Sequence, residues 1–235
     1  NVEAGNLVLG SGITVRGDTG FIGIQTFAGG AASLTNNGTI QADVAAGKIT
    51  IAVNGAVTNN GTLAALNGGT LLLNSSINNT AGSQILAGAG SSVLQNGVTL
   101  NGTINVVGGG SFTATGSVNN FLDAASFTGA LDLASGSGIE RVTNGLTLNG
   151  SVNIGNGSIF APQGDQTIGG SGAIVFADAN ASNRFNVEAG NLVLGSGITV
   201  RGDTGFIGSQ NFAGGAASLT NHGTISADGG GTITL

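Results

Sequence analysis

The beginning of the chain returns almost unchanged near its end. Residues 1–43 recur as residues 186–228, and only four of the aligned pairs differ. A near-identical copy so far along the chain indicates tandem duplication, so the chain must adopt a fold that can be extended by adding units. We therefore predict one long repeat over residues 1–185, with the next copy beginning at residue 186. The four differing pairs are Ile24/Ser209, Thr26/Asn211, Asn37/His222 and Gln41/Ser226.

A shorter, degenerate repeat lies inside the long one, and eight of these short units make up one long repeat. Each unit reads apolar-x-apolar, then Asn-Asn or Asn-Gly, then Thr or Ser and a second alternating run, as in SLTNNGTIQAD (33–43). Alternation with a period of two predicts strands with one buried face. The 46 glycines, which recur beside Asn, Ser and Thr, favour turns and disfavour helices.

A unit this short cannot bury its own apolar face, whereas stacked units cover one another. The sequence therefore predicts an all-β fold, a right-handed parallel β-helix of about ten coils of roughly 19–29 residues, over residues 1–235 as a single continuous β-helix fragment. A β-sandwich is the main alternative, but it does not predict Asn at one phase of the repeat. The interior is expected to contain Ile40, Leu63, Ile104, Val152 and Ile225, and phenylalanines such as Phe21, Phe112, Phe127 and Phe176.

Recurrent asparagines are expected to stack in one row at a corner of the coil. Asn tolerates left-handed backbone and bonds to local backbone at bends, and stacked Asn side chains form amide ladders. We interpret the row as structural; the alternative is a repetitive ligand-binding face. His222 lies in this row opposite Asn37, and a lone histidine does not make a metal site. The row comprises Asn36, Asn37, Asn59, Asn60, Asn78, Asn79, Asn101, Asn119, Asn120, Asn149 and Asn221.

A second motif is the tripeptide Arg-Gly-Asp, at Arg16, Gly17 and Asp18, which the duplication repeats at Arg201, Gly202 and Asp203. It matches a short integrin-binding motif of adhesion proteins, so these residues are candidate binding residues. Integrin recognition needs the motif on a protruding loop. The adjoining GITV segment reads as a strand, so the interpretation we favour is a turn with solvated charges.

Composition excludes several classes of function. The formal net charge is −6 with only five Lys and Arg, which argues against a nucleic-acid partner. No apolar run approaches the ~18 residues of a membrane span. The chain has no Cys and one His, so we expect no disulfide, metal site or cofactor. Its start at Asn1 and the missing signal peptide suggest an internal fragment of a larger precursor.

The pattern SLTNNGTI, VTNNGTL and VTLNGTINV resembles the repeats of filamentous-haemagglutinin-like adhesins and large autotransporters. The resemblance covers nearly the whole chain in composition and repeat style. It implies type V or two-partner secretion, a location on the outside of a bacterial cell, and a role in cell-surface attachment, aggregation or biofilm formation. The implied partners are a host or neighbouring-cell receptor or glycan, together with self-association end to end or laterally.

Sequence reasoning thus favours the structural stalk of a secreted bacterial surface adhesin. The alternatives are a self-assembling extracellular fibre or sheath subunit and a module that binds integrin or glycan. A β-helix polysaccharide-degrading enzyme is least favoured, because sugar cleavage uses paired carboxylates and the eleven acidic residues are scattered. We therefore expect no enzymatic activity and no catalytic residues.

Overall fold

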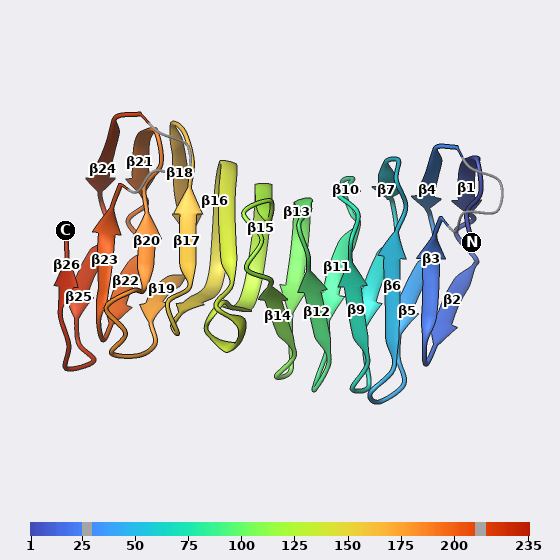
Figure 1. The fold of residues 1–235 in the computed structure, drawn as a ribbon, viewed down its shortest axis with the longest axis horizontal. Coiled ribbons are helices and arrows are strands. Elements are labelled where there is room, and N and C mark those ends of the chain that lie inside the picture. Colours follow the sequence, from blue (N-terminus) through green and yellow to red (C-terminus); the bar gives the residue numbers. More distant parts are fainter. Residues whose placement is uncertain (25–29, 210–214) are drawn as a thin grey trace. The chain divides into compact units, whose positions relative to one another are not determined.

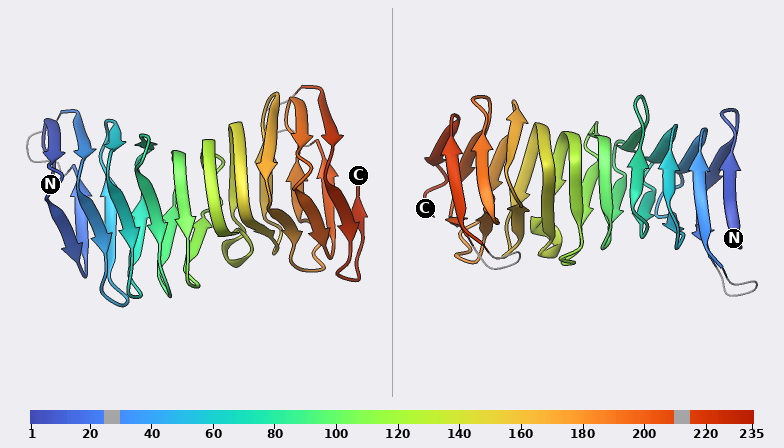
Figure 2. Two further views of the ribbon diagram at one scale, coloured as in Figure 1. Left: turned by 180° about the vertical axis from the view of Figure 1, so that it is seen from behind. Right: turned by 90° about the horizontal axis from the view of Figure 1, so that it is seen from above.

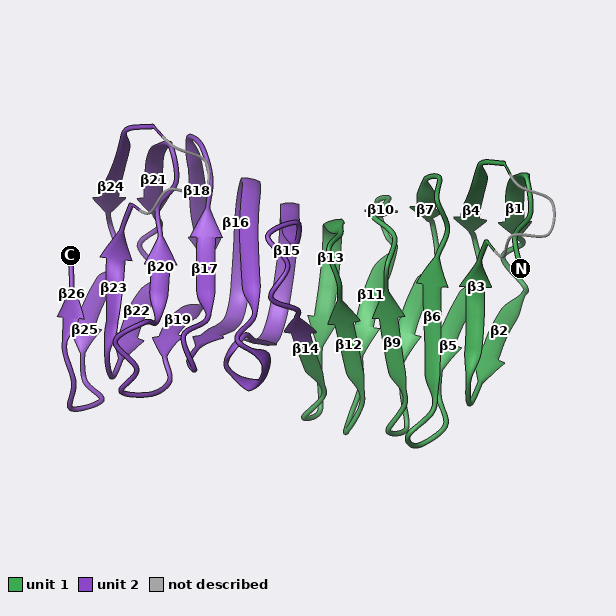
Figure 3. Ribbon diagram, in the orientation of Figure 1, with its two compact units in different colours: residues 1–112 green, residues 113–235 purple. Residues whose placement is uncertain are grey.

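A computed structural model describes residues 1–24, 30–209 and 215–235. It shows the predicted parallel β-solenoid, in about nine turns (Figure 1). Within the described ranges the helical structure is confined to the single 3₁₀ turn η1 (Ala134–Gly136), and no helix there is long and apolar enough to cross a membrane. The chain divides into two units, residues 1–112 and 113–235 (Figure 3). The predicted handedness and the prediction of one continuous β-helix stay predictions.

In the first unit, each turn of the chain contributes three short strands separated by tight bends. From β1 to β10 each strand pairs in parallel with the third strand after it along the chain, as in β1–β4–β7, β2–β5–β8 and β3–β6–β9. The longer strand β13 pairs with both β10 and β11. Three parallel sheets result, one on each side of the coil (Figure 2). The strands are β1 (Gly5–Leu9), β2 (Thr14–Gly17), β3 (Gly20–Gly23), β4 (Ala32–Asn36), β5 (Thr39–Ala42), β6 (Lys48–Ala52), β7 (Val57–Asn59), β8 (Thr62–Ala65), β9 (Thr70–Leu73), β10 (Ile77–Asn79), β11 (Gln84–Ala87), β12 (Ser92–Gln95), β13 (Thr99–Val106) and β14 (Ser111–Ala114), which crosses the unit boundary.

The second unit begins with two long, bent strands and continues with short ones. The long strand β16 pairs in succession with three strands, β17, β18 and β19, and the coils beyond it repeat the pairing of every third strand. The strands are β15 (Phe121–Asp132), β16 (Ile139–Ile154), β17 (Ile159–Pro162), β18 (Gln166–Gly170), β19 (Ala173–Phe176), β20 (Arg184–Asn186), β21 (Gly190–Leu194), β22 (Thr199–Gly202), β23 (Gly205–Gly208), β24 (Ala217–Asn221), β25 (Thr224–Ala227) and β26 (Ile233–Thr234).

The core is a set of apolar columns that run along the inside of the coils. Ile40, Leu63, Ile85 and Ile104 are in register on successive strands, and all four are fully buried. Each such side chain contributes about 1.5–3 kcal/mol by leaving water. Because every coil supplies the same columns, the coils bury one another, which confirms the reason for predicting a solenoid from the repeat.

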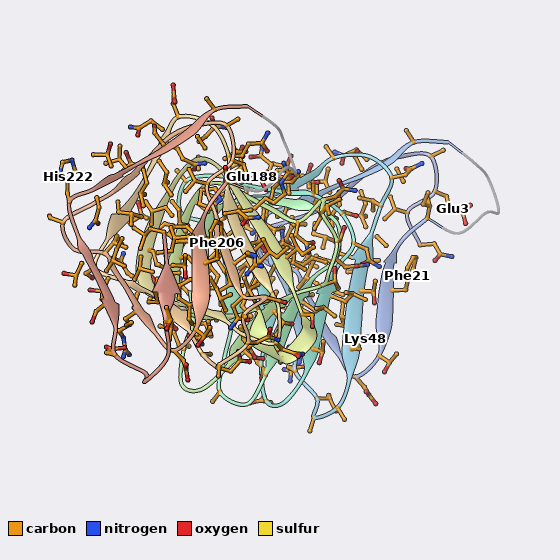
Figure 4. All side chains as sticks on the ribbon, turned by 60° about the vertical axis from the view of Figure 1, so that its left-hand side comes forward. Glu3, Phe21, Lys48, Glu188, Phe206 and His222 are labelled. Atoms are coloured by element: carbon orange, nitrogen blue, oxygen red, sulfur yellow. The ribbon has the colours of Figure 1, made fainter. Side chains whose placement is uncertain are left out.

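Most of the predicted interior residues are buried. Phe112, Phe127 and Phe176 are buried, as are Ile40, Leu63, Ile104 and Val152. The prediction for Phe21 was wrong: its side chain is 41% exposed and lies on the outside of β3 (Figure 4). Its neighbour Ile22 takes the inward position, in register with the buried Ile51. Ile225 is only half-buried.

Candidate functional site

The two Arg-Gly-Asp tripeptides lie where a strand ends. Arg16 and Gly17 end β2, and Asp18 follows. The Arg16 guanidinium forms an ion pair with the buried carboxylate of Asp43, while the Asp18 carboxylate accepts a hydrogen bond from the Thr19 hydroxyl (3.2 Å). The motif is therefore part of a coil corner, with its arginine held by the next coil.

The second tripeptide has the same arrangement. Arg201 is 3.7 Å from the carboxylate of Asp228, and the Asp203 carboxylate accepts a hydrogen bond from the hydroxyl of the adjacent threonine (3.0 Å). Gly202 has φ +118° and is buried, and a Cβ built on it lies 2.2 Å from the carbonyl oxygen of Phe176. Only glycine fits this close approach between neighbouring coils. The glycine of the motif thus has a structural role, and integrin binding stays an untested alternative.

The predicted row of asparagines divides into two ladders in the first unit. In the inner ladder, Asn36 Nδ2 donates to Asn59 Oδ1 (2.8 Å), and Asn59 Nδ2 donates to Asn79 Oδ1 (2.8 Å). These three residues are in register at the ends of β4, β7 and β10, and all are buried. Each rung is a buried amide that bonds both to its own bend and to the coil beside it, so the ladder helps to fix how these coils align.

The outer ladder runs along the solvent side of the same corner. Asn60 Nδ2 donates to Asn37 Oδ1 (2.8 Å), and the Thr80 hydroxyl donates to Asn60 Oδ1 (2.8 Å). A separate pair lies on a different column, where Asn101 Nδ2 donates to Asn78 Oδ1 (2.8 Å) and Asn78 is in register with Thr58. Because these amides mostly bond to one another, they form a regular polar edge along the corner. The alternative of a ligand-binding face stays untested.

In the second unit the remaining asparagines of the predicted row do not stack on one another. Asn120 is buried before β15, where its amide donates to the Thr115 carbonyl (2.8 Å), and Asn119 is exposed beside it. Asn149 is in register with Thr128, whereas Asn221 is in register with Leu194. The unequal lengths of these coils shift the asparagines to different positions along the turn. The side chain of His222 is exposed (Figure 4).

The second unit contains a cluster of buried charges that the sequence did not predict. Arg141 on β16 lies 3.6 Å from the buried carboxylate of Glu188 and donates to Gln163 Oε1 (2.6 Å). Its guanidinium also stacks over the ring of Phe121, 4.6 Å from the centroid. Glu140, the preceding residue on β16, is fully buried. The rarity of charged residues in this chain, 7%, is the one signal that could have drawn attention to them.

The turn after β19 is organised by one carboxylate. Asp178 accepts hydrogen bonds from the Asn183 side-chain amide (2.7 Å) and from the backbone N–H groups of Asn156 (2.7 Å) and Asn180 (3.0 Å). The Asn183 hydrogen bond, helped by the two backbone donors, lowers the pKa of the Asp178 carboxyl below its ordinary value of 3.8. This carboxylate therefore stabilises a turn that joins neighbouring coils.

Asp123 and Asp132 lie near opposite ends of β15 and bond to different neighbours. Asp123 accepts hydrogen bonds from Thr143 and Asn144, while Asp132 at the other end of β15 accepts one from the Ser135 backbone. Among the described residues, no group of three or more His, Cys, Asp and Glu side chains is placed to hold a metal ion.

Two hollows on the described surface are lined by residues of neighbouring coils. The one beside Asn144 and Thr167 has a volume of about 290 Å³, and the one between Ala56, Ser76 and Thr99 about 230 Å³. Pockets for small molecules usually hold roughly 300–1,000 Å³. These hollows are therefore grooves between outward side chains of neighbouring coils.

Comparison with known protein families, curated proteins and solved structures found no significant match. No family model matches the chain. No curated protein and no solved structure is significantly similar to it. Function is therefore inferred from the fold and from the geometry described above.

Proposed function

We propose that this chain is a structural stalk region of a secreted bacterial surface adhesin. The observation that supports this best is that buried polar side chains bond between coils. The buried amides of Asn36, Asn59 and Asn79 and the ion pair of Arg141 with Glu188 bond across coils, where they hold the stack together. Their role is to specify and stiffen a repeating structure, as a stalk requires.

A solenoid also suits the mechanical task of a stalk, which is to hold a binding function away from the cell. Backbone hydrogen bonds between strands run along the stack, and each coil adds its own stability and its contact with its neighbours. A near-identical copy of the module over residues 1–185 can lengthen such a stalk without changing its surface. The rod then carries a binding function over a distance that the number of modules sets.

Location and role are tested on intact bacteria that express the parent protein. Antibodies raised against this chain should label intact cells, and mild proteolysis of whole cells should remove the label. Deleting one long module in frame should shorten the surface layer seen by electron microscopy while the cells still bind the same surfaces. Labelling only after permeabilisation would contradict the proposed location, and an unchanged layer would contradict the stalk role.

A binding role for the tripeptides is a second candidate, favoured by the position of Asp18 and Asp203 at coil corners. Beads coated with the chain would be tested for adhesion to integrin-bearing cells. The variant Asp18→Glu/Asp203→Glu keeps both charges and lengthens each side chain by one methylene. Equal adhesion of both proteins would exclude the tripeptide as the binding element, and loss in the variant alone would support it.

A further inference from the structure

The step from asparagine to glycine is the chemically weakest link in this sequence. The glycine nitrogen attacks the asparagine Cγ, the bond from Cγ to the amide nitrogen breaks, and ammonia leaves with the proton of the glycine N–H. Water then opens the resulting succinimide to aspartate or isoaspartate. Both products carry a new negative charge, and isoaspartate also lengthens the backbone by one carbon. The nine steps begin at Asn37, Asn54, Asn60, Asn67, Asn96, Asn101, Asn144, Asn149 and Asn156.

Three of these steps form the same left-handed turn. Asn67, Asn144 and Asn156 have φ of +53°, +57° and +55°, and all three are exposed. Each is followed by a glycine that also has positive φ, as is typical of tight Asn-Gly turns. Water reaches these asparagines, so their exposure alone predicts that they react readily.

The structure shows that the attacking nitrogen is held at each of these turns. The glycine N–H donates to a side-chain oxygen of the following coil, and the residue that supplies this oxygen is at most 9% exposed. We call Ser91, Gln166 and Asn183 the capping side chains. The three bonds are Gly68 N–H to Ser91 Oγ (2.9 Å), Gly145 N–H to Gln166 Oε1 (3.1 Å) and Gly157 N–H to Asn183 Oδ1 (3.0 Å).

The inner ladder makes the same kind of bond at two further steps. Asn36 Oδ1 accepts from the Gly38 N–H (3.2 Å), and Asn59 Oδ1 accepts from the Gly61 N–H (3.3 Å). These two glycines follow asparagines of the outer ladder. Buried side-chain oxygens therefore hold the glycine N–H at five Asn-Gly steps, in both units of the chain.

Such a bond opposes deamidation for two reasons. The peptide must turn to bring the glycine nitrogen to Cγ, and this movement breaks the bond and leaves a buried oxygen without its donor. The nitrogen must also lose its proton, which would place negative charge directly beside an oxygen lone pair. Both effects raise the free energy of the attacking state above that of an uncapped turn.

We propose that the exposed Asn-Gly turns are latent deamidation sites and that the capping side chains suppress the reaction by holding the glycine N–H. Suppression keeps the corners uncharged and keeps the backbone length of each coil unchanged, as register between stacked coils requires. The inference concerns the chemical lifetime of the fold and does not depend on the adhesive role.

Ser91→Ala in the full-length chain tests one cap. Wild type and variant are incubated in mildly alkaline buffer, and deamidation at each asparagine is followed by peptide mapping with mass spectrometry. Loss of one hydrogen bond should speed deamidation of Asn67 about two- to tenfold. Asn156 in the same molecule keeps its own cap, so its rate should stay at the wild-type value.

Ser92→Ala is the matched control, because it removes the hydroxyl of the adjacent, half-buried serine and leaves the cap in place. Its Asn67 rate should equal that of wild type. An unchanged rate in Ser91→Ala, or an equal rise in Ser92→Ala, would overturn the proposal.

A second comparison separates capping from general loosening of the fold. Unfolding wild type in urea removes all caps, so Asn67 and Asn156 should both deamidate faster than in the folded protein. Equal rates in folded and unfolded wild type would show that the caps do not protect. A rise in Ser91→Ala that is as large at Asn156 as at Asn67 would show loosening instead of capping and would likewise refute the proposal.

Discussion

Replacing Asn59 with alanine removes the middle rung of the inner ladder. The Asn59 side-chain oxygen accepts from Asn36 Nδ2 (2.8 Å), and its amide donates to Asn79 Oδ1 (2.8 Å). The same amide lies 3.2 Å from the backbone carbonyl oxygens of Gly61 and Gln84. All of these contacts disappear together, and Asn59 is fully buried, so solvent does not replace them directly.

The expected loss of stability follows from these contacts. Asn79 Oδ1 loses its side-chain donor in a buried position, which costs about 1–3 kcal/mol. The lost bonds to Asn36 and to the backbone add about 1–2 kcal/mol, because bifurcated bonds contribute less than separate ones. We therefore expect Asn59→Ala to lower the free energy of unfolding by about 2–5 kcal/mol.

The neighbouring residue Asn60 supplies a matched control. It is also the middle rung of a ladder, with 2.8 Å bonds to Asn37 and Thr80, but its side chain is exposed. Water replaces the bonds that Asn60→Ala removes, so the expected loss is below about 1 kcal/mol. The two variants remove the same chemical group from adjacent positions and differ in burial.

Urea denaturation followed by far-ultraviolet circular dichroism measures the difference. Solenoids can unfold in steps, so the midpoint and slope of the first transition are compared between variants. The reasoning is refuted if Asn59→Ala shifts this transition no more than Asn60→Ala does. It is also refuted if Asn59→Ala costs less than about 1 kcal/mol.

Three further changes are predicted from the structure. Gly202→Ala should lower the free energy of unfolding by about 2–4 kcal/mol, because the added Cβ meets a backbone oxygen. Gly17→Ala has open space around the added Cβ, so in the same urea assay it should lower the free energy of unfolding by only about 1 kcal/mol. Arg141→Met should lower the free energy of unfolding by about 3–5 kcal/mol, because Glu188 stays buried without the guanidinium, and the melting temperature should fall with it. Arg141→Met/Glu188→Leu should recover most of this loss, and no recovery would contradict the pairing. The folded-state pKa of Asp178 is lowered, so its charged form stabilises the fold above the ordinary carboxyl pKa, and this stabilisation is lost as the pH falls through the lower folded value. The stability difference between wild type and Asp178→Asn should therefore stay constant from about pH 7 to about pH 5 and shrink as the pH falls below about 4, and a difference that stays constant down to about pH 2 would contradict the assignment.

The fold class could be predicted from local patterns in the sequence. Alternation of apolar and polar residues specifies which side of a strand is buried, and Asn-Gly steps specify where the chain bends. The repeat length shows that one unit is too small to bury its apolar side alone. Ile40, Leu63 and Ile104 were placed in the interior on these grounds, and the structure agrees.

The positions of side chains between coils were harder to predict. Asn149 matches the repeat pattern, yet it lies opposite Thr128 and Asn221 lies opposite Leu194, because coils of unequal length shift the pairing. The approach of Arg141 to Glu188 joins residues that are far apart in the sequence and lie on different coils. No local pattern encodes such a contact, which depends on the register of the strands between them.

The sequence by itself determined that strands and turns repeat, that their apolar side chains face inward, and that a long module is duplicated. Only the tertiary structure decided which side chains of neighbouring coils meet. Asn59 bonds to Asn36 and Asn79 on the coils beside it, whereas Asn149 lies opposite Thr128. Burial depends on what lies across the gap of about 4.8 Å between strands, and this information is carried by other residues far away in the sequence.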